Sequence, residues 1–439
     1  MWFRQPSGWT PVQLGSVCLE TDRRVGRARS NLPIMSVTKS GIVPQAETYT
    51  KEVSSQDQSL YKILKPGEFS AAPMSLYYGA VGKYRGHEEA IVSPAYITFC
   101  ASGSVNSDFL DLVLRDRRIV QVYSALSQGA NKEGKRRTTS FSDFCSIRRP
   151  MPRLSEQCAI ASVLSEVCSA IEAVELLIKE VEHAKTAVMR ELLTRGLAGE
   201  WARMVPLPER WVLGRVAEGV THMPAGWQLV RYDEACLSIQ VGIVVQPASL
   251  YADVGVPALR SLNVKENQVD RSNMVLISEK AHKANKKSEL RAGNVVTVRT
   301  GVPGISAVVP DDLDGANCID ILISRIGKNA VPGFLTQFLN SSLAKRQIAV
   351  LQGGLAQQHL NVKELKGLKL LLPPLDEQIA IADAGEAFDR RIAAERAHLS
   401  ELRATKDALA QELLSGRVRL PASMIARFET APPHEAAAE

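Results

Sequence analysis

An internal repeat is the strongest constraint on how this chain can fold. The run LSEQCAIA at residues 154–161 recurs as LDEQIAIA at residues 375–382. The alignment, offset by 221 residues, continues without a gap to ELL at residues 191–193 and 412–414. A chain that repeats itself at this length is built from copies of one structural unit.

Shorter matches extend the repeat outside these segments. PSGW at residues 6–9 resembles PAGW at residues 224–227, and GAVG at residues 79–82 resembles GVPG at residues 301–304. The order is a variable block, a helical block, a variable block and a helical block. The predicted boundaries are residues 1–150 for the first variable domain, 151–196 for the first long helix, 197–223 for an extended linker, 224–372 for the second variable domain, 373–420 for the second long helix and 421–439 for a disordered tail.

Apolar residues in both helical blocks follow a heptad pattern. In the first block the steps alternate between four and three, which is typical of helices packed side by side. Each block predicts a helix of about 40 residues, or about 60 Å at 1.5 Å per residue. Ser155 and Asp376 are expected to cap the N-termini, and Gly196 and Gly416 to end the helices. The predicted seam, which is also the candidate partner interface, consists of Ile160, Leu164, Val167, Ile171, Ile178, Ile381, Phe388, Ile392, Leu399 and Leu402.

A lysine interrupts each seam at the same position, Lys185 in the first block and Lys406 in the second. Long side chains of this kind commonly extend out of a seam towards water. A polar seam residue can also fix the register of two helices.

The variable blocks have a mixed α/β pattern. Residues 90–99 and 294–300 are rich in strand-forming residues, and residues 107–124 and 331–347 have helical periodicity. The predicted fold class is therefore α+β, with two mixed α/β domains separated by two long antiparallel helices and related by a pseudo-twofold repeat.

The charge of the chain alternates with the repeat. Residues 1–150 hold 20 Lys and Arg against 13 Asp and Glu, and residues 221–372 hold 17 against 12. Residues 151–200 and 373–439 are both acidic in balance. Basic blocks can attract phosphate, whereas acidic blocks should avoid it.

Polar and basic loops in both variable blocks are candidates for contact with nucleic acid. Arg and Lys suit guanine, and Asn and Gln suit adenine. Because basic loops occur in both blocks, the pattern favours contact with phosphate over contact with bases. For any single loop, a solvated surface without function is an equally good interpretation. The candidate DNA-binding residues are Lys39, Lys83, Tyr84, Arg85, His87, Lys132, Lys135, Arg136, Arg137, Lys283, Lys286, Lys287, Arg299, Gln357, Gln358 and His359.

The doubled helical motif resembles the repeated regions of specificity subunits of Type I restriction–modification systems. The shared pattern is Leu-x-Glu-Gln, a long heptad helix and a closing Glu-Leu-Leu-[Ser/Thr]; residues 32–38, 73–76 and 352–354 also resemble the target-recognition domains of that family. The resemblance spans about residues 9–420. It implies two domains that each read half of a split DNA target, and helices that set the spacer and dock adenine methyltransferase subunits.

The same resemblance implies that partner subunits do the chemistry. Methylation would use S-adenosylmethionine, and restriction subunits would use ATP, so this chain is expected to carry no cofactor and no catalytic residue. The sequence contains no GxxxxGK[ST] phosphate loop, no methyltransferase-like Asn/Asp-Pro-Pro-Tyr/Phe motif and no cysteine spacing typical of zinc. The seven cysteines are expected to be reduced structural thiols.

Two other interpretations stay open at this point. One is a solitary specificity cassette without a working partner, and the other is a coiled-coil scaffold that binds proteins rather than DNA. The sequence has no apolar run near the ~18 residues of a membrane helix and no signal-peptide core, so a cytoplasmic location is expected.

Overall fold

The computed structural model describes residues 4–26, 31–48, 57–127, 137–198, 203–208, 220–244, 247–351 and 359–429. The chain divides into two compact units, each of which combines one globular lobe with parts of two long helices. The first unit contains residues 1–173 and 399–439, and the second contains residues 174–398. We call residues 4–151 the first lobe and residues 220–372 the second lobe.

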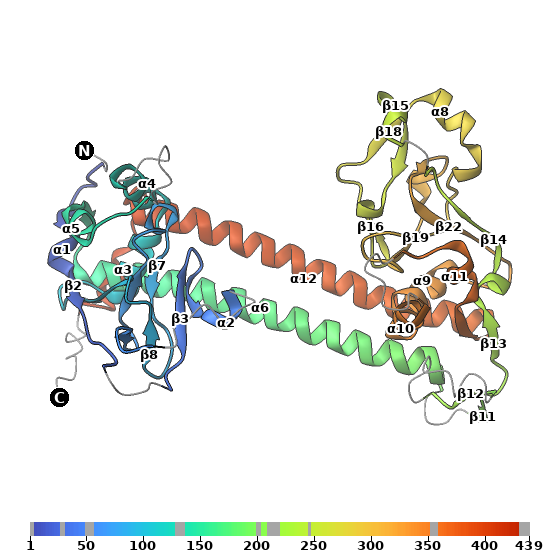
Figure 1. Cartoon of the computed structure of the whole chain (residues 1–439), viewed down its shortest axis with the longest axis horizontal. Helices are drawn as coiled ribbons and strands as arrows, with labels where there is room; N and C mark the ends of the chain where they lie inside the picture. Colours follow the sequence, from blue (N-terminus) through green and yellow to red (C-terminus); the bar gives the residue numbers. More distant parts are fainter. Residues whose placement is uncertain are drawn as a thin grey trace. The chain divides into compact units, whose positions relative to one another are not determined.

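The first lobe is built on two four-stranded sheets (Figure 1). One has the order β2-β9-β6-β7, the other the order β4-β3-β8-β5, and a separate pair, β1-β10, joins the two ends of the lobe. The strands are β1 (Thr10–Gln13), β2 (Cys18–Thr21), β3 (Ile34–Thr38), β4 (Gly41–Pro44), β5 (Lys62–Leu64), β6 (Phe69–Ala71), β7 (Val81–Lys83), β8 (Ala90–Val92), β9 (Ile97–Ala101) and β10 (Arg148–Met151). The helices are α1 (Leu14–Val17), α2 (Gln45–Thr48), α3 (Ser107–Arg115), α4 (Arg117–Leu126) and α5 (Phe141–Ser146), with a 3-10 turn, η1, at Leu76–Tyr78.

The second lobe repeats this plan. Its four-stranded sheet has the order β14-β22-β19-β20, and β13-β23 joins the ends of the lobe as β1-β10 does in the first. These strands are β13 (Gln228–Arg231), β14 (Cys236–Val241), β19 (Val295–Val298), β20 (Ser306–Val308), β22 (Ile321–Ile326) and β23 (Lys369–Leu372). A three-stranded sheet, β18-β15-β21, and a hairpin, β16-β17, complete the lobe with β15 (Tyr251–Leu259), β16 (Val264–Lys265), β17 (Gln268–Val269), β18 (Val275–Ile277) and β21 (Asn317–Cys318). The helices are α8 (Glu279–Ala284), α9 (Pro332–Asn340), α10 (Ser342–Leu351) and α11 (Val362–Gly367), and the short 3-10 turns include η4 (Tyr232–Ala235), η7 (Lys286–Ser288) and η8 (Asp311–Leu313).

The two lobes confirm the internal repeat at the level of single turns. The PSGW and PAGW segments both bend through a left-handed glycine, at Gly8 and Gly226, so that the tryptophan amide donates to the carbonyl of the proline three residues before it. Trp9 and Trp227 are buried in equivalent places. The mixture of helices and sheets confirms the predicted α+β fold class.

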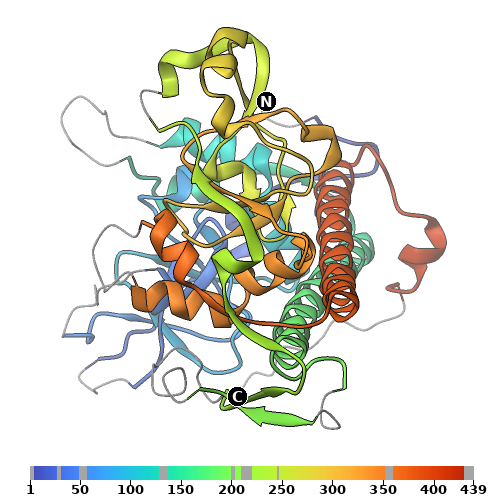
Figure 2. The same cartoon turned by 90° about the vertical axis from the view of Figure 1, so that its right-hand side faces the viewer.

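The long helices are α6 (Leu154–Arg195) and α12 (Leu375–Ser415). In the second unit they run antiparallel, because Glu182 pairs with Arg396 and Lys185 with Asp389 while Glu377, near the start of α12, contacts the end of α6. Figure 2 shows them side by side next to the second lobe.

The predicted helix ends need one correction. Gly196 and Gly416 adopt left-handed φ values of 72° and 69° directly after the helices, as expected for C-terminal stops. Ser155 and Asp376 do not cap the N-termini, because both helices begin one residue earlier, at Leu154 and Leu375.

Most of the predicted seam is buried. Ile160, Leu164, Ile171 and Ile178 on α6 are at most 8% exposed, as are Ile381 and Ile392 on α12. The other predicted seam residues, Val167, Phe388, Leu399 and Leu402, are half-buried. Near the start of α6, Ile160 and Leu164 share a core with Leu413 of α12 and the first lobe.

Three other expectations are corrected. The helices predicted at 107–124 and 331–347 are each broken in two, at Asp116 and Ser341. The tail is not wholly irregular, since α13 (Ala422–Ala426) buries Ile425. The linker contains a hairpin, β11-β12, formed by Met204–Pro206 and His222–Pro224. No described helix is long and apolar enough to cross a membrane.

Candidate nucleic-acid interface

The second lobe brings two distant candidates together at the end of β19. An isolated β-bridge joins Thr300 to His359, and the Leu360 amide donates to the Arg299 carbonyl. The Thr300 hydroxyl lies 3.1 Å from His359 Nδ1, and Arg299 Nη1 donates to Asp320 Oδ1 at 2.7 Å. The result is a polar corner with an exposed imidazole and a guanidinium that is 23% exposed and would have to exchange its ion pair with Asp320 to bind a base.

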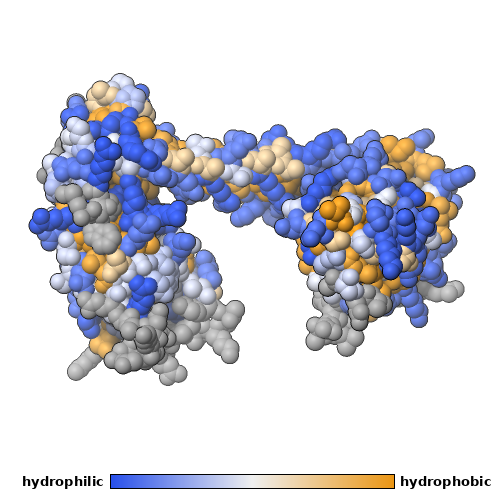
Figure 3. Space-filling view, turned by 90° about the horizontal axis from the view of Figure 1, so that it is seen from above, coloured by the Kyte–Doolittle hydropathy of each residue, from blue (hydrophilic) through white to orange (hydrophobic). Residues whose placement is uncertain are grey.

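A second group of candidates lies on α8 and η7. Lys283, Lys286 and Lys287 are all exposed, and none has an acidic partner among the described residues. Ser278 caps α8 by accepting from the Ala281 amide, which fixes the start of this basic segment. Figure 3, which views the molecule from above Figure 1, shows hydrophilic and hydrophobic patches side by side on this face of the second lobe. Exposed lysines without carboxylate partners are suited to binding phosphate.

In the first lobe, carboxylates engage two of the candidate cations. Lys83 Nζ pairs with Asp108 at 3.0 Å, and Arg85 pairs with Asp108 at 3.1 Å and Asp111 at 2.9 Å. Although burial opposes the charge, these carboxylates raise the pKa of Arg85 above its usual range. Arg85 is therefore held beside the start of α3, and it would have to exchange an ion pair to bind DNA phosphate.

Four other first-lobe candidates differ in exposure. Lys39, in the turn between β3 and β4, and His87 are exposed. Tyr84 is only 5% exposed and packs with Met35, so its ring offers no face for base stacking in this conformation. Arg137 lies 5.0 Å from the Tyr77 ring centroid and donates to the Ser124 carbonyl. The remaining candidates fall outside the described residues: Lys132, Lys135, Arg136, Gln357 and Gln358.

The repeated glutamines of the helical motif join each lobe to its own long helix. Gln157 accepts from the Asn106 amide at 3.0 Å and donates to the Pro152 carbonyl at 2.8 Å. Gln378 accepts from the Val331 amide at 2.8 Å and donates to the Pro373 carbonyl at 2.8 Å. Asn106 and Val331 are the residues that precede α3 and α9. The same side chain thus fixes the start of a lobe helix to the start of a long helix in both units.

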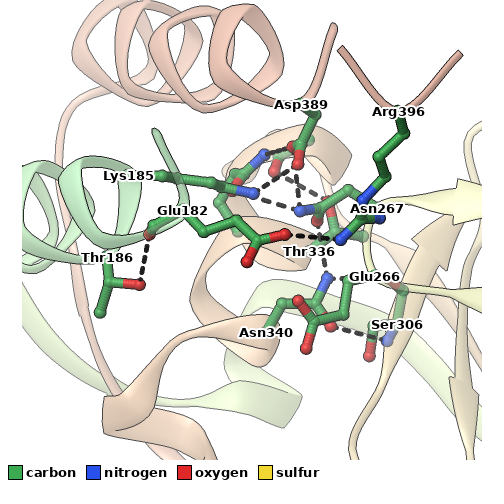
Figure 4. Close-up of polar contacts among 12 residues, drawn as sticks. Glu182, Lys185, Thr186, Glu266, Asn267, Ser306, Thr336, Asn340, Asp389 and Arg396 are labelled. Atoms are coloured by element: carbon green, nitrogen blue, oxygen red, sulfur yellow. Dashed lines mark hydrogen bonds and ion pairs between the residues drawn. The ribbon is translucent and has the colours of Figure 1, made fainter. Parts of the chain in front are cut away.

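A polar network holds the second lobe against the helices (Figure 4). Lys185 Nζ on α6 lies 2.5 Å from Asp389 Oδ1 on α12. The other Asp389 oxygen accepts from Gln337 Nε2 at 2.9 Å and from Asn267 Nδ2 at 3.1 Å. Asn340 extends the network by donating to Asn267 Oδ1 at 2.7 Å. Lys185 therefore does not extend freely into water; it forms part of the register-fixing contact, the second of the two roles considered for it.

Sequence reasoning missed the partners in these two contacts. The glutamine could have been found, because it recurs at the same offset inside the most similar part of the repeat. Asp389 could not, because the corresponding position of the first repeat is Cys168. All seven cysteines are free thiols, in agreement with the expectation.

Comparisons with a family model and with known sequences agree on one family. Residues 253–404 match the family described as the type I restriction modification DNA specificity domain. A Methanocaldococcus jannaschii chain assigned as the MjaX specificity subunit of a type I restriction enzyme is 23% identical over 418 residues, which cover 93% of this chain and 91% of that one. The MjaVIII specificity subunit of the same organism is 24% identical over 63% of each chain.

Two solved structures share the fold. One comes from work on complex assembly and conformational transition of the type I restriction–modification system; it has a TM-score of 0.55 at 17% identity and covers 95% of this chain and 100% of that chain. The other is the S subunit of a Type-I restriction–modification system from M. genitalium, with a TM-score of 0.53 at 12% identity, covering 93% and 99%. The predicted resemblance is confirmed: residues 253–404 match the DNA specificity domain family, and the chain is similar over most of its length to a chain named as a type I specificity subunit.

Proposed function

We propose that the chain is the DNA-reading subunit of a type I restriction–modification complex. Each lobe reads one part of a bipartite target in duplex DNA. The observation that carries the proposal is the presence of two lobes with the same sheet order, each fixed by a motif glutamine to the start of a long helix, in a relative of the specificity subunits.

The target should be asymmetric, because the two lobes offer different side chains. The second lobe exposes Lys283, Lys286 and Lys287 and the corner formed by Arg299 and His359. In the first lobe, Lys83 and Arg85 are engaged by carboxylates on α3, as Arg299 of the second lobe is by Asp320, and the exposed candidates are Lys39 and His87. Two surfaces that differ in this way are not expected to read the same bases.

We propose that the long helices carry the partner subunits and set the unread spacer between the two half-sites. Half-buried seam residues such as Phe388 and Leu399 leave apolar surface that another helix can cover, and Leu176 on α6 is 59% exposed. Partner subunits would methylate adenine with S-adenosylmethionine and cut DNA with ATP. This chain would supply recognition and no catalytic residue, and the expected cytoplasmic location stays a prediction.

Salt dependence of DNA binding tests the role of Lys283 in α8 and of Lys286 and Lys287 in η7. In the assembled complex, replacing Lys283, Lys286 and Lys287 by glutamine should reduce the slope of log binding constant against log salt by about 0.9 per lost phosphate contact. The matched control is Lys328→Gln, since this exposed lysine lies next to the segment that Gln378 fixes to α12. An unchanged slope in the triple variant would mean that these three lysines do not contact DNA phosphates.

Methylome mapping in a host that carries the chain and its partners tests the function itself. The expected result is a split, asymmetric methylated motif. Deleting one heptad from both long helices should shorten the tolerated spacer, and an intact complex with an unchanged spacer would contradict the spacing role.

The alternative, a coiled-coil scaffold that binds only proteins, is less well supported because residues 253–404 match a DNA specificity domain. It predicts that any DNA binding by the assembled complex shows no sequence preference and keeps its salt slope when Lys283, Lys286 and Lys287 are replaced. Copurification with an adenine methyltransferase separates the proposed subunit from a solitary cassette.

A further inference from the structure

The first unit contains a pocket whose charged lining residues are all arginines. Its volume is about 620 Å³, and it lies between the N-terminal segment, α4, β10 and the end of α12. Four arginines line it, and no Asp or Glu is among its lining residues; the arginines are Arg4, Arg118, Arg149 and Arg417. We call it the arginine pocket.

The deepest cation of the pocket is firmly built into the fold. The Arg149 side chain is 2% exposed, and its Nη2 donates to Asp116 at 2.9 Å and to the Leu414 carbonyl at 3.0 Å. Asp116 also accepts from Arg118, so one carboxylate serves two guanidinium groups. Burial of a cation is costly unless opposite charge compensates it. Arg417 pairs with Glu412 at 2.5 Å, so two carboxylates, Asp116 and Glu412, compensate the four lining arginines only in part, and an excess of positive charge stays at the pocket.

The glutamate of the helical motif has different partners in the two units. In the second unit, Glu377 accepts from the Trp227 indole Nε1 at 2.9 Å and from the Leu197 amide at 2.9 Å, next to the end of α6. In the first unit, Glu156 of the same motif pairs with Arg419. The Trp9 indole is buried and its Nε1 has no acceptor among the described residues.

We propose that the arginine pocket binds a small anion that carries phosphoryl groups. Guanidinium groups match the oxygens of a phosphate in paired hydrogen bonds, and several together favour a ligand with more than one negative charge. A volume of about 620 Å³ is within the range of small-molecule sites. A DNA duplex presents its phosphates on a broad convex surface, so the ligand is a small molecule, and the site is distinct from the proposed DNA-reading surfaces.

Calorimetric titration of the full chain with inorganic diphosphate tests the proposal. We expect saturable one-site binding that Arg4→Gln and Arg118→Gln each weaken about tenfold, as expected for loss of a charge-assisted contact. Arg4 is exposed, so its replacement should not disturb folding. The control Arg427→Gln changes an exposed arginine of the same unit outside the pocket, and it should bind diphosphate as the parent chain does.

Several outcomes would overturn the proposal. They are the absence of binding at millimolar diphosphate, an equal loss in Arg427→Gln, tighter binding of citrate than of diphosphate, or equal binding of chloride. Duplex binding by the assembled complex should be the same in Arg4→Gln and the parent chain. If the complex of the parent chain does not bind DNA while diphosphate still binds, the proposed function is wrong, but the proposal that the arginine pocket binds such an anion still holds.

Discussion

Replacement of Asp389 by leucine should loosen the second lobe from its helices. The carboxylate accepts from Lys185, Gln337 and Asn267. The Lys185 and Asp389 side chains are 16% and 27% exposed, so the pair is largely shielded from water. Removing one partner from a fully buried pair costs ~3–5 kcal/mol. Partial exposure reduces this figure, and we expect a loss of about 2–3 kcal/mol in the free energy of opening of the second unit.

A double-mutant cycle separates the ion pair from packing. Lys185→Met combined with Asp389→Leu removes both charges, so the double variant should be more stable than Asp389→Leu alone by ~1 kcal/mol or more. The matched control is Arg390→Gln, which breaks an exposed i,i+4 pair with Glu386. Such a pair contributes only about 0.3–0.5 kcal/mol.

Hydrogen–deuterium exchange of the full chain is the suitable assay, because it reports the opening of each helix and strand separately. Asp389→Leu should increase exchange in α9, which contains Gln337, while α3 in the first unit keeps its protection. The reasoning is refuted if α9 exchanges no faster in Asp389→Leu than in Arg390→Gln, or if the effects of the two charge removals simply add.

Three further predictions concern single side chains. Gln378→Leu should destabilise the second unit by about 2–4 kcal/mol, because the Val331 amide and Asn329 carbonyl lose a buried partner; urea unfolding that shows less than ~1 kcal/mol would contradict this. Gly196→Ala should cost at least about 1 kcal/mol, because φ is +72° and a Cβ there would lie 2.3 Å from a Glu377 oxygen, and a thermal melt unchanged from the parent would be inconsistent with that conformation. Burial would raise the pKa of Asp116, but hydrogen bonds and charge from Arg118 and Arg149 outweigh it and lower the pKa below the ordinary 3.8. The stabilisation should therefore be complete above about pH 4 and lost as the pH falls through the lower folded pKa, and Asp116→Asn should remove this part of the acid sensitivity measured by denaturation at several pH values.

The sequence predicted the regular parts of the fold well. The heptad spacing identified both long helices, and the glycines after them marked their ends, because a left-handed residue there is a local requirement. Periodicity missed the breaks at Asp116 and Ser341, since the apolar face continues across each break while only the backbone direction changes. Asp116 caps α4 by accepting from the Arg118 amide, which is a local signal for such a break.

The candidate site was predicted less completely. Composition identifies a basic loop, but it does not tell which cations meet a carboxylate in the folded chain. Lys83 and Arg85 do so through residues 23 to 26 positions away, whereas Lys283, Lys286 and Lys287 meet no carboxylate in the part of the chain that the structure describes. Tyr84 likewise reads as a loop residue in sequence and is buried in the structure, because its neighbours in the core come from other strands.

The paired strands at the base of each lobe have a consequence for how new specificities can arise. Thr10 lies opposite Met151, and Gln228 lies opposite Leu372, so the chain enters and leaves a lobe at adjacent points. Everything between those points can be exchanged for a different insert that closes with the same two strands. Recombination at these two borders would give a protein in which one lobe is new and the long helices are unchanged.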